Sequence, residues 1–317
     1  MEEKSPTDNR AERSRNIGRA FKGGTAAFAL LVLMLGALIV YELVASSGPA
    51  FDKFGLGFLA SKQWDPVSEE FGALPFIWGT FYTSILALAL ALPVSLGVAV
   101  FLTELAPMWL RQPVGFLVEL LAAIPSLVYG LWGLFVLAPI MQSTVQPFLA
   151  KYDYLPFFTG YPLGLGVMTA GMIVAIMIIP TISSISREVM LTVPETQREG
   201  GLALGMTRWE VVSKVVIPYS RSGILGGVIL GFGRALGETM AVTMVIGNTP
   251  KISLSLFDPG YTISSVLANE FAEATEKLHV SVLVELGLIL FVISILMNSM
   301  AKLLLWRMNR YSAGTRL

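Results

Sequence analysis

The chain of 317 residues has no cysteine, a single histidine and few charges. Without cysteine it can form neither disulfides nor thiolate metal sites, and it has no cysteine nucleophile. One imidazole does not make a metal site, so we expect His279 to snorkel or cap near a membrane interface. Charged residues make up 14% of the chain and hydrophobic residues 54%. A soluble domain carries charge on about a quarter of its residues, so this composition is typical of an integral membrane protein.

The sequence also lacks the patterns of several other protein classes. Its net charge is zero, which gives no bulk attraction to nucleic acid. It contains no G-x4-G-K-[ST] phosphate loop, so the chain does not bind ATP in the usual way. Nothing resembles a catalytic triad or a set of metal ligands. We therefore expect a chain that is not an enzyme, binds no nucleic acid and holds no metal or cofactor of its own.

Long apolar runs predict six membrane-spanning helices, since a bilayer is crossed by roughly 20 residues at about 1.5 Å per residue. The expected spans are 25–44, 76–102, 113–140, 163–185, 219–246 and 280–305. Pro125 and Ser126 interrupt the third span, and we interpret them as a plain kink in preference to a broken helix. The predicted fold class is an all-α integral membrane protein.

The spans divide the chain into two tails, an anchor and a main membrane domain. Residues 1–22 are polar and are expected to form a disordered tail. Residues 23–47 hold the first helix, which is too long for the core of a signal peptide and is interpreted as an uncleaved anchor. The other five helices lie in 74–305, and 306–317 form a short basic tail.

The distribution of basic residues predicts the orientation. Of 22 basic residues, 16 lie in the turn 103–112, the segment 187–221 and the two tails, when Lys302 near the end of the last span is counted with the C-terminal tail. The opposite loops hold only Lys53, Lys62, Lys151, Lys251 and Lys277. The positive-inside rule therefore places both termini and the segment 187–221 in the cytoplasm.

A polar segment between the fourth and fifth spans carries a recognisable motif, E-G-G-x3-G-x9-V-x-I-P. It resembles the EAA motif of ABC-importer permeases, E-A-A-x3-G-x9-I-x-L-P. Glu199, Gly205 and Pro218 fit directly, and Gly200 and Gly201 replace the two alanines. We expect two short helices with a sharp break at Gly205 and an end of the amphipathic segment at Pro218.

The resemblance implies that the loop 187–218 contains a cytoplasmic coupling helix, which docks in a groove of a separate ATPase subunit. A helical hairpin lying on the membrane surface is the alternative. The complete motif, on the side that the basic residues assign to the cytoplasm, favours the coupling helix.

The fifth span contains one cation and one anion, Arg234 and Glu238. With a spacing of i, i+4 they would lie on one helix face, where they can pair. A structural ion pair is one interpretation. Each charge inside a membrane costs about 2.5–3.5 kcal/mol on insertion scales, which favours a role on a transport pathway. We expect Arg234 to offer forked donors to a passing anion, and Glu238 to neutralise Arg234 when the site is empty.

Glycines crowd the same span. The pairs Gly227 and Gly231, and Gly233 and Gly237, form small-x3-small patterns that let another backbone approach closely. We expect tight packing along the pathway, against another helix of this chain or a partner subunit.

Most of the chain resembles phosphate-specific permease subunits of type I ABC importers. The matching pieces are GGVILGFGRALGETMAVTMVIGN (226–248), FLTELAP (101–107), ELLAAIPSLVYGLWGLFVLAP (119–139), IMIIPTISS (176–184) and several short pieces within 267–294. The resemblance implies a MetI-like fold in a bacterial inner membrane and import of inorganic phosphate. It implies as partners a second, homologous permease, an ATPase dimer that binds the ATP and Mg²⁺, and an external phosphate-binding protein.

Three other interpretations stay open. A sulfate or molybdate permease would also use one arginine. A secondary transporter or channel acting alone would not need the coupling motif. A signalling role in phosphate sensing is not separable from transport by sequence. The acidic residues of the external segment 248–278 are expected either to touch a binding protein or to be solvated, and Glu119 and Glu285 to be interfacial or paired.

Overall fold

The computed structural model describes residues 6–313, and every named element in that range is a helix. Six helical stretches of the described chain are long and apolar enough to cross a membrane: Phe21–Ser46, Leu74–Leu105, Ser126–Tyr152, Val167–Leu191, Arg208–Leu236 and Lys277–Arg307. The predicted all-α membrane fold with six spanning helices is confirmed.

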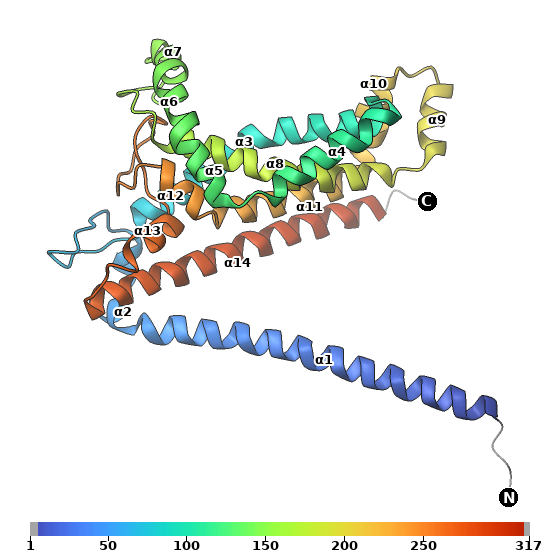
Figure 1. The fold of residues 1–317 in the computed structure, drawn as a ribbon, viewed down its shortest axis with the longest axis horizontal. Coiled ribbons are helices and arrows are strands. Elements are labelled where there is room, and N and C mark those ends of the chain that lie inside the picture. Colours follow the sequence, from blue (N-terminus) through green and yellow to red (C-terminus); the bar gives the residue numbers. More distant parts are fainter. Residues whose placement is uncertain (1–5, 314–317) are drawn as a thin grey trace, which may run out of the picture.

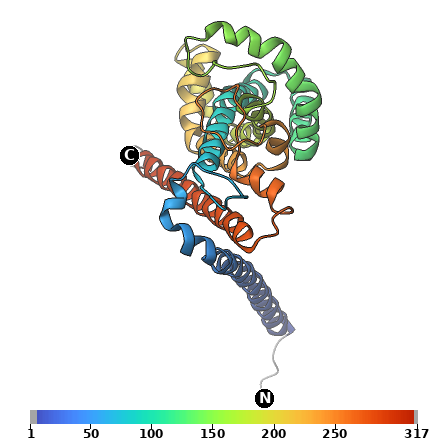
Figure 2. The same cartoon turned by 90° about the vertical axis from the view of Figure 1, so that its left-hand side faces the viewer.

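The first helix, α1 (Pro6–Ser46), stands apart from the rest of the chain. It meets the other helices only near its C-terminal end and diverges from them in both views (Figures 1 and 2). None of its apolar window is buried inside the chain. The disordered tail expected at 1–22 is wrong from Pro6 onward, because alanine, glutamate and arginine there are good helix formers that extend the apolar helix; residues 1–5 lie outside the described part.

Four helices run along one another to form the main bundle: α3 (Leu74–Val100), α8 (Val167–Leu191), α11 (Ile217–Leu236) and α14 (Lys277–Ala313) (Figure 1). Helix α8 is central, since 67% of its apolar window is buried, against 33% or less in the other five. Its side chains Ile173, Met177, Ile178 and Ile182 are fully buried. Because these side chains are closely surrounded by neighbouring helices, they fix how α3 and α11 pack around α8.

The third span predicted at 113–140 is broken, not kinked, and the stretch long enough to cross a membrane begins only after the break, at Ser126. Helix α4 (Met108–Ala123) lies along the bundle, and α5 (Ser126–Trp132) begins after an extended pair with ψ of 128° at Ile124 and 142° at Pro125. The chain then turns away through α6 (Ala138–Ile140) and α7 (Gln146–Leu149) (Figure 1). The plain kink that we predicted is wrong, because proline disfavours helical backbone in the residue before it and supplies no N–H.

The fifth span also differs from its prediction. One helical path runs Arg208–Leu236, through α10 (Arg208–Val211), a π turn (Val212–Val216) and α11. It ends at Leu236, and the separate short helix α12 (Met240–Val245) follows after a gap of three residues. The continuous helix expected over 219–246 is therefore wrong.

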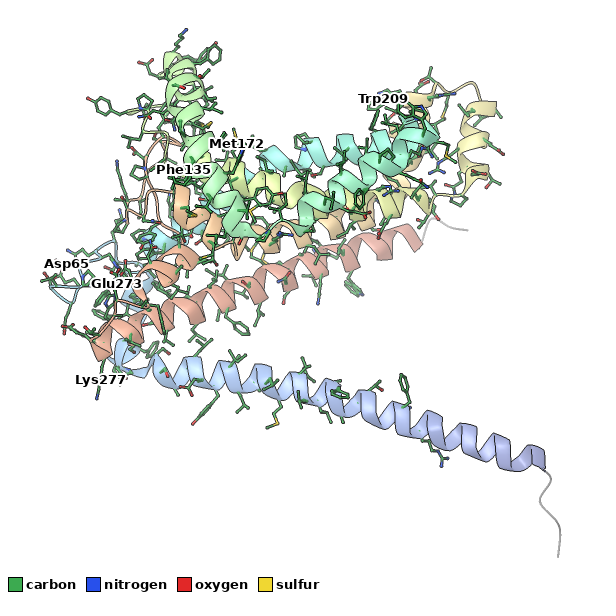
Figure 3. All side chains as sticks on the ribbon, in the orientation of Figure 1. Asp65, Phe135, Met172, Trp209, Glu273 and Lys277 are labelled. Carbon is green, nitrogen blue, oxygen red and sulfur yellow. The ribbon has the colours of Figure 1, made fainter. Side chains whose placement is uncertain are left out.

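The bundle has two distinct ends. At one, which we call the α9 end, lie α9 (Glu195–Ala203) and α10, and α14 ends on the same side (Figure 1). At the other, the α13 end, lie α2 (Gly48–Phe54), the 3-10 helix η1 (Gly55–Leu59) and α13 (Ile263–Glu270). Trp209 marks the first end, and Asp65, Glu273 and Lys277 mark the second (Figure 3).

Candidate functional site

Arg234 and Glu238 lie on either side of a helix end. Arg234 is in the last turn of α11, and Glu238 lies in the gap before α12. They form no ion pair, and Arg234 has no protein hydrogen-bond partner in the part of the chain that the structure describes. Glu238 Oε1 instead accepts from the backbone N–H groups of Thr239 (3.2 Å) and Ala241 (3.5 Å). The predicted i, i+4 pairing is wrong because the helix does not continue between the two residues.

The gap between α11 and α12 lies beside α5, the helix that follows the break at Ile124 and Pro125. Helix α12 packs on α5. A Cβ added to Gly130 of α5 would lie 2.9 Å from Met244 Sδ and 3.1 Å from Ala241 Cα, so only glycine permits this approach. Both discontinuities therefore belong to one packed arrangement, and irregular backbone at membrane depth is tolerated where protein or a polar cavity surrounds it.

Tyr129 of α5 lies within electrostatic range of Arg234. The tyrosine is 7% exposed, and its hydroxyl donates to the carbonyl of Leu121 at 2.8 Å across the α4–α5 break. Arg234 itself is half-buried. A guanidinium with unused donors in such a place can bind an oxyanion through paired hydrogen bonds. No carboxylate of the described residues occupies these donors when the anion is absent.

The four packing glycines separate into two kinds. A Cβ on Gly231 would lie 2.6 Å from Ile182 Cγ1, and one on Gly227 would lie 3.2 Å from Ile185 Cβ, so both face α8 closely. A Cβ on Gly233 or Gly237 would meet nothing nearer than 3.8 Å. Within this chain the first pair packs α11 on α8, and the second leaves surface open near Arg234.

The motif segment folds as two short helices around Gly205. Gly205 has a φ of +83°, a left-handed backbone that favours glycine, so the expected break is observed. Thr207 then starts α10 with a capping box: Glu210 N–H donates to Thr207 Oγ1 (3.3 Å), and Thr207 N–H donates to Glu210 Oε2 (2.9 Å). The geometry between α9 and α10 is thereby fixed by local chemistry.

Pro218 does not end a helix. It lies in the first turn of α11, directly after the π turn. Proline cannot donate to the carbonyl four residues before it, and a π turn lets the helix pass such a gap. Our expectation that Pro218 separates an amphipathic segment from the membrane helix is wrong, and α10 is a rigid extension of the spanning helix.

Helix α9 is tied to the bundle by Arg198. Its Nη2 lies 3.1 Å from Glu104 Oε1 and donates to the Met190 carbonyl at 2.8 Å. Both charged side chains are largely buried, at 21% and 15% exposed. The sequence interpretation missed this tie. The signal available was a carboxylate placed directly after a span and an arginine beside the motif.

The outward surface of the motif segment is uncovered. Glu199 and Gly200 are exposed, whereas Gly201 packs on Val211. Three large apolar side chains are also exposed: Leu202 (49%), Leu204 (81%) and Trp209 (64%). Exposed apolar side chains beside the exposed Glu199 are typical of a surface that contacts another protein.

The α13 end carries a closed network around Glu270. Its carboxylate accepts from Trp64 Nε1 (3.1 Å) and from the Tyr261 hydroxyl (3.3 Å), and it lies 3.2 Å from His279 Nε2. His279 therefore pairs within the protein and does not snorkel as expected. Of the acidic residues in 248–278, Glu270 is structural, and Glu273 and Glu276 are exposed.

The loop before α13 is held by a second charged contact, between Lys251 and Asp258 (2.8 Å). Partial burial acts to raise the pKa of Asp258, but hydrogen bonds from Lys251 and Ser253 outweigh it and keep that pKa below its ordinary value. The carboxylate thus stays charged and paired at neutral pH.

Glu285 of α14 is buried without a partner. It is 7% exposed, lines an apolar pocket of about 430 Å³, and its Oε2 has no hydrogen bond. Helix α2 folds over it and is anchored where the Ala50 N–H donates to Ser281 Oγ at 3.1 Å; Ser281 Oγ in turn donates to the carbonyl of Ser46, the last residue of α1, at 2.8 Å. The expected pairing is wrong, because the chain between the first two spans covers this face of α14 without offering a partner. The other expectation, an interfacial position, stays a prediction.

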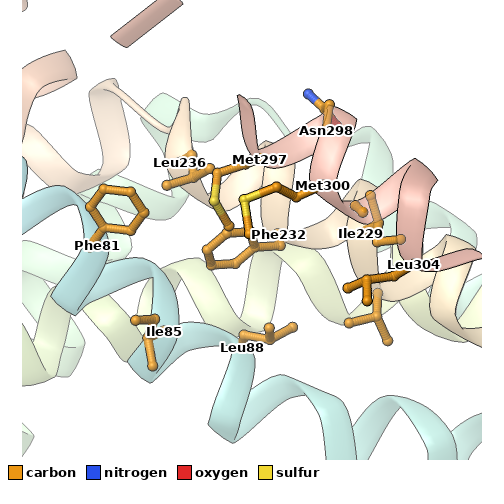
Figure 4. A pocket seen from close by; sticks show the side chains of 13 residues that line it. Phe81, Ile85, Leu88, Ile229, Phe232, Leu236, Met297, Asn298, Met300 and Leu304 are labelled. Carbon is orange, nitrogen blue, oxygen red and sulfur yellow. The ribbon is translucent and has the colours of Figure 1, made fainter. Parts of the chain in front are cut away.

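A second apolar pocket of about 430 Å³ lies between α3, α11 and α14 (Figure 4). Phe81, Phe232 and Met300 line it, and Asn298 is its one polar side chain. Such a lining offers no charge to an anion.

Comparison with known proteins defines the class. The model of binding-protein-dependent transport system inner membrane components matches residues 95–310. The chain belongs to this family, and it is therefore a multi-pass inner membrane component of a transport system.

Individual relatives agree over nearly the whole chain. The chain is 52% identical to a phosphate transport system permease protein PstC of Mesorhizobium japonicum, over 91% of this chain and 90% of the relative. It is 49% identical to the PstC of Pasteurella multocida, over 92% of each. A probable PstC of Methanocaldococcus jannaschii is 39% identical over 86% of each.

A solved structure shares the fold. An inward-facing MetNI methionine ABC transporter chain superposes with a TM-score of 0.53, covering 77% of this chain and 99% of that one at 15% identity. The MetI-like fold of ABC importer permeases is confirmed by this likeness and by the family match.

Proposed function

We propose that this chain is the permease subunit of an ATP-driven importer for inorganic phosphate. Relatives at about half identity over nine tenths of the chain are phosphate permeases by name. The observation that carries the proposal to a site is Arg234, a membrane-embedded arginine with free donors beside two helix breaks. Phosphate offers several oxygens to a forked guanidinium.

Glu238 remains part of the proposed pathway in a changed role. Its carboxylate holds the first N–H groups of α12 and so keeps the break beside Arg234 in place. Its negative charge is also proposed to weaken the hold of Arg234 on a bound anion and so to favour release.

The α9 end is the proposed cytoplasmic side, as the basic residues predict. There Glu199, Leu202 and Trp209 are available to a partner ATPase. ATP and Mg²⁺ bind on that ATPase dimer, and this chain binds neither. When the ATPase dimer closes, it moves α9, and Arg198 passes the motion to α8 and to the turn after α3. A second, homologous permease forms the other half of the path, and an external phosphate-binding protein delivers the anion at the α13 end.

The decisive experiment measures phosphate uptake by cells that carry Arg234→Gln. Membrane levels of the complex and its ATPase activity are measured in parallel, and Arg307→Gln, an exposed change at the α9 end, is the control. Uptake lost from an intact complex that still hydrolyses ATP supports the pathway role. Lost assembly returns Arg234 to a structural role, and normal uptake sinks the assignment.

Two further measurements separate the alternatives. Competition by sulfate and molybdate tests whether the site prefers another oxyanion. Uptake in cells without the partner ATPase tests a stand-alone transporter, which would continue to work. The reversed pair Arg234→Glu with Glu238→Arg restores function only if the two residues act as a simple pair, and we expect no rescue.

A further inference from the structure

A cleft of about 470 Å³ lies at the α9 end of the bundle, between α4, α8 and the turn after α3. Two arginines line it together with one amide and several apolar side chains: Arg111, Gln112, Arg187, Met108, Trp109 and Leu191. It is separate from the Arg234 break, which lies at the opposite end of α11 from α10. Nothing in the proposed transport path uses these arginines.

The guanidinium of Arg111 is held in place but is only partly used. Its Nε donates to the Ala106 carbonyl at 2.8 Å. Its two terminal amino groups have no partner among the described residues. An arginine oriented by one backbone bond loses less side-chain freedom when the remaining donors bind a ligand.

Arg187 reaches the same cleft from α8. Its guanidinium lies over the bare face of Gly115, where an added Cβ would be 3.2 Å from Nη1. The nearest carboxylate, Glu119, is 3.9 Å away and 63% exposed, too far for a hydrogen bond and screened by solvent. Most of the donors of Arg187 are therefore free to bind an anion.

We propose that this cleft binds a phosphate group. The guanidinium groups of Arg111 and Arg187 line the cleft from different helices, and together they offer more donors than a single carboxylate can accept. A tetrahedral phosphate has enough oxygens to accept hydrogen bonds from both. Gln112 adds a neutral donor. Free inorganic phosphate and the headgroup of an acidic phospholipid share this chemistry, and the exposed Trp109 beside the arginines also suits a membrane interface. A phosphate held between α4 and α8 fixes the first half of the broken third span against the central helix.

The test uses the native complex, purified through a tag on this chain and carrying Arg234→Gln, so that the pathway site does not contribute. In nanodiscs of neutral phosphatidylcholine, binding of radioactive inorganic phosphate is measured at equilibrium. If free phosphate is the ligand, Arg111→Gln weakens binding about tenfold or more, because charge-assisted hydrogen bonds are lost. Arg307→Gln, which removes an exposed arginine elsewhere at the same end, leaves it unchanged.

The second arm uses nanodiscs that mix phosphatidylcholine with phosphatidylglycerol, and native mass spectrometry counts the acidic lipid retained. If the lipid headgroup is the ligand, Arg111→Gln reduces retained phosphatidylglycerol and Arg307→Gln does not. Gln112→Glu, an exposed change that leaves both arginines in place, introduces a repelling charge and has the same effect as Arg111→Gln. It decides the matter if Arg111→Gln fails to assemble.

The outcomes are distinct. Loss in the first arm alone identifies free phosphate, and loss in the second alone identifies the phospholipid. The proposal is overturned if the complex binds neither probe. It is also overturned if Gln112→Glu leaves the binding of both probes unchanged. Because Arg234 is already changed, these results stand apart from the test of the transport pathway.

Discussion

The two ends of the bundle differ in how far the chain itself covers their large aromatic side chains. At the α13 end, Trp64 packs edge-on against Phe71 (5.0 Å between ring centroids) and Phe76 (4.5 Å), and its N–H is bound by Glu270. At the α9 end, Trp209 is 64% exposed and contacts no aromatic ring in the described chain. One tryptophan is partly buried against aromatic rings of its own chain, and the other is mostly exposed.

This difference separates a self-sufficient end from an incomplete one. The α13 end ties its loops to the spanning helices with buried hydrogen bonds, such as Trp78 Nε1 to the Ser253 carbonyl (3.0 Å) and the Ile263 N–H to Thr80 Oγ1 (3.0 Å). Buried polar groups that have hydrogen-bond partners rigidify a region, although Ser264 Oγ and Glu285 Oε2 at this end have none. The α9 end is ordered locally by Gly205 and the capping box. Its exposed apolar side chains contribute stabilising contacts only when a partner binds them.

The largest effect is expected from Trp64→Ala. Truncating a packed tryptophan costs about 3–5 kcal/mol, and here Glu270 also loses a donor. Thermal unfolding of the purified chain in detergent, followed by size-exclusion chromatography, is expected to show a clearly lower midpoint. An unchanged midpoint would mean that the α13 end is not held by this cluster.

Trp209→Ala is the matched change at the other end. The isolated chain is expected to keep its unfolding midpoint, because the side chain is mostly exposed. Binding of the ATPase partner is expected to weaken by about 2–4 kcal/mol if Trp209 is a central contact. Co-purification at graded protein concentrations measures this. A drop in stability with normal partner binding would reverse the comparison between the two ends.

The six spans and the break at Gly205 follow from the sequence because they depend on local properties. Apolar length decides whether a helix crosses a membrane, and a left-handed residue after a short helix favours glycine. The break before α12 does not follow in this way. Gly237 is one of several glycines in this span and is not marked out from them by the sequence. Helix α12 contacts Gly130, which is far away in the sequence.

In the third span, Pro125 predicts where the helix is interrupted but not how. Pro125 marks a discontinuity, but the choice between a kink and a break depends on what surrounds the freed backbone, which is tertiary information. Glu285 was misplaced for the same reason, since the fold of α2 over α14 decides its burial. The candidate site was thus located by residue type, and its geometry required the packing of α5 on α12.

Gly79→Ala tests how tightly the α13 end is closed. An added Cβ would lie 2.2 Å from the carbonyl oxygen of Tyr261, and backbone on both sides leaves little room to adjust. Overpacking of this kind costs about 1–3 kcal/mol. At the α9 end, Gly200→Ala meets nothing within 4 Å and is expected to leave the unfolding midpoint unchanged. Equal midpoints for the two variants would show that the loop at Tyr261 yields easily.

The smallest expected effect is a pH dependence confined to the α13 end. Burial, reinforced by the Glu270 carboxylate, raises the pKa of Tyr261 to about 12. An unfolded tyrosine ionises near pH 10, so the preference of the fold for the neutral phenol stabilises it fully below about pH 10. That contribution is lost as the pH rises from about 10 to about 12. The unfolding midpoint is expected to fall over this window, and to fall less in Tyr261→Phe, which has no proton to lose. Lysines and the other tyrosines titrate in both proteins, so the difference between the two curves isolates Tyr261. Parallel curves would show that the phenol is not enclosed, and the contrast between a sealed end and an open one would then rest on Trp64 alone.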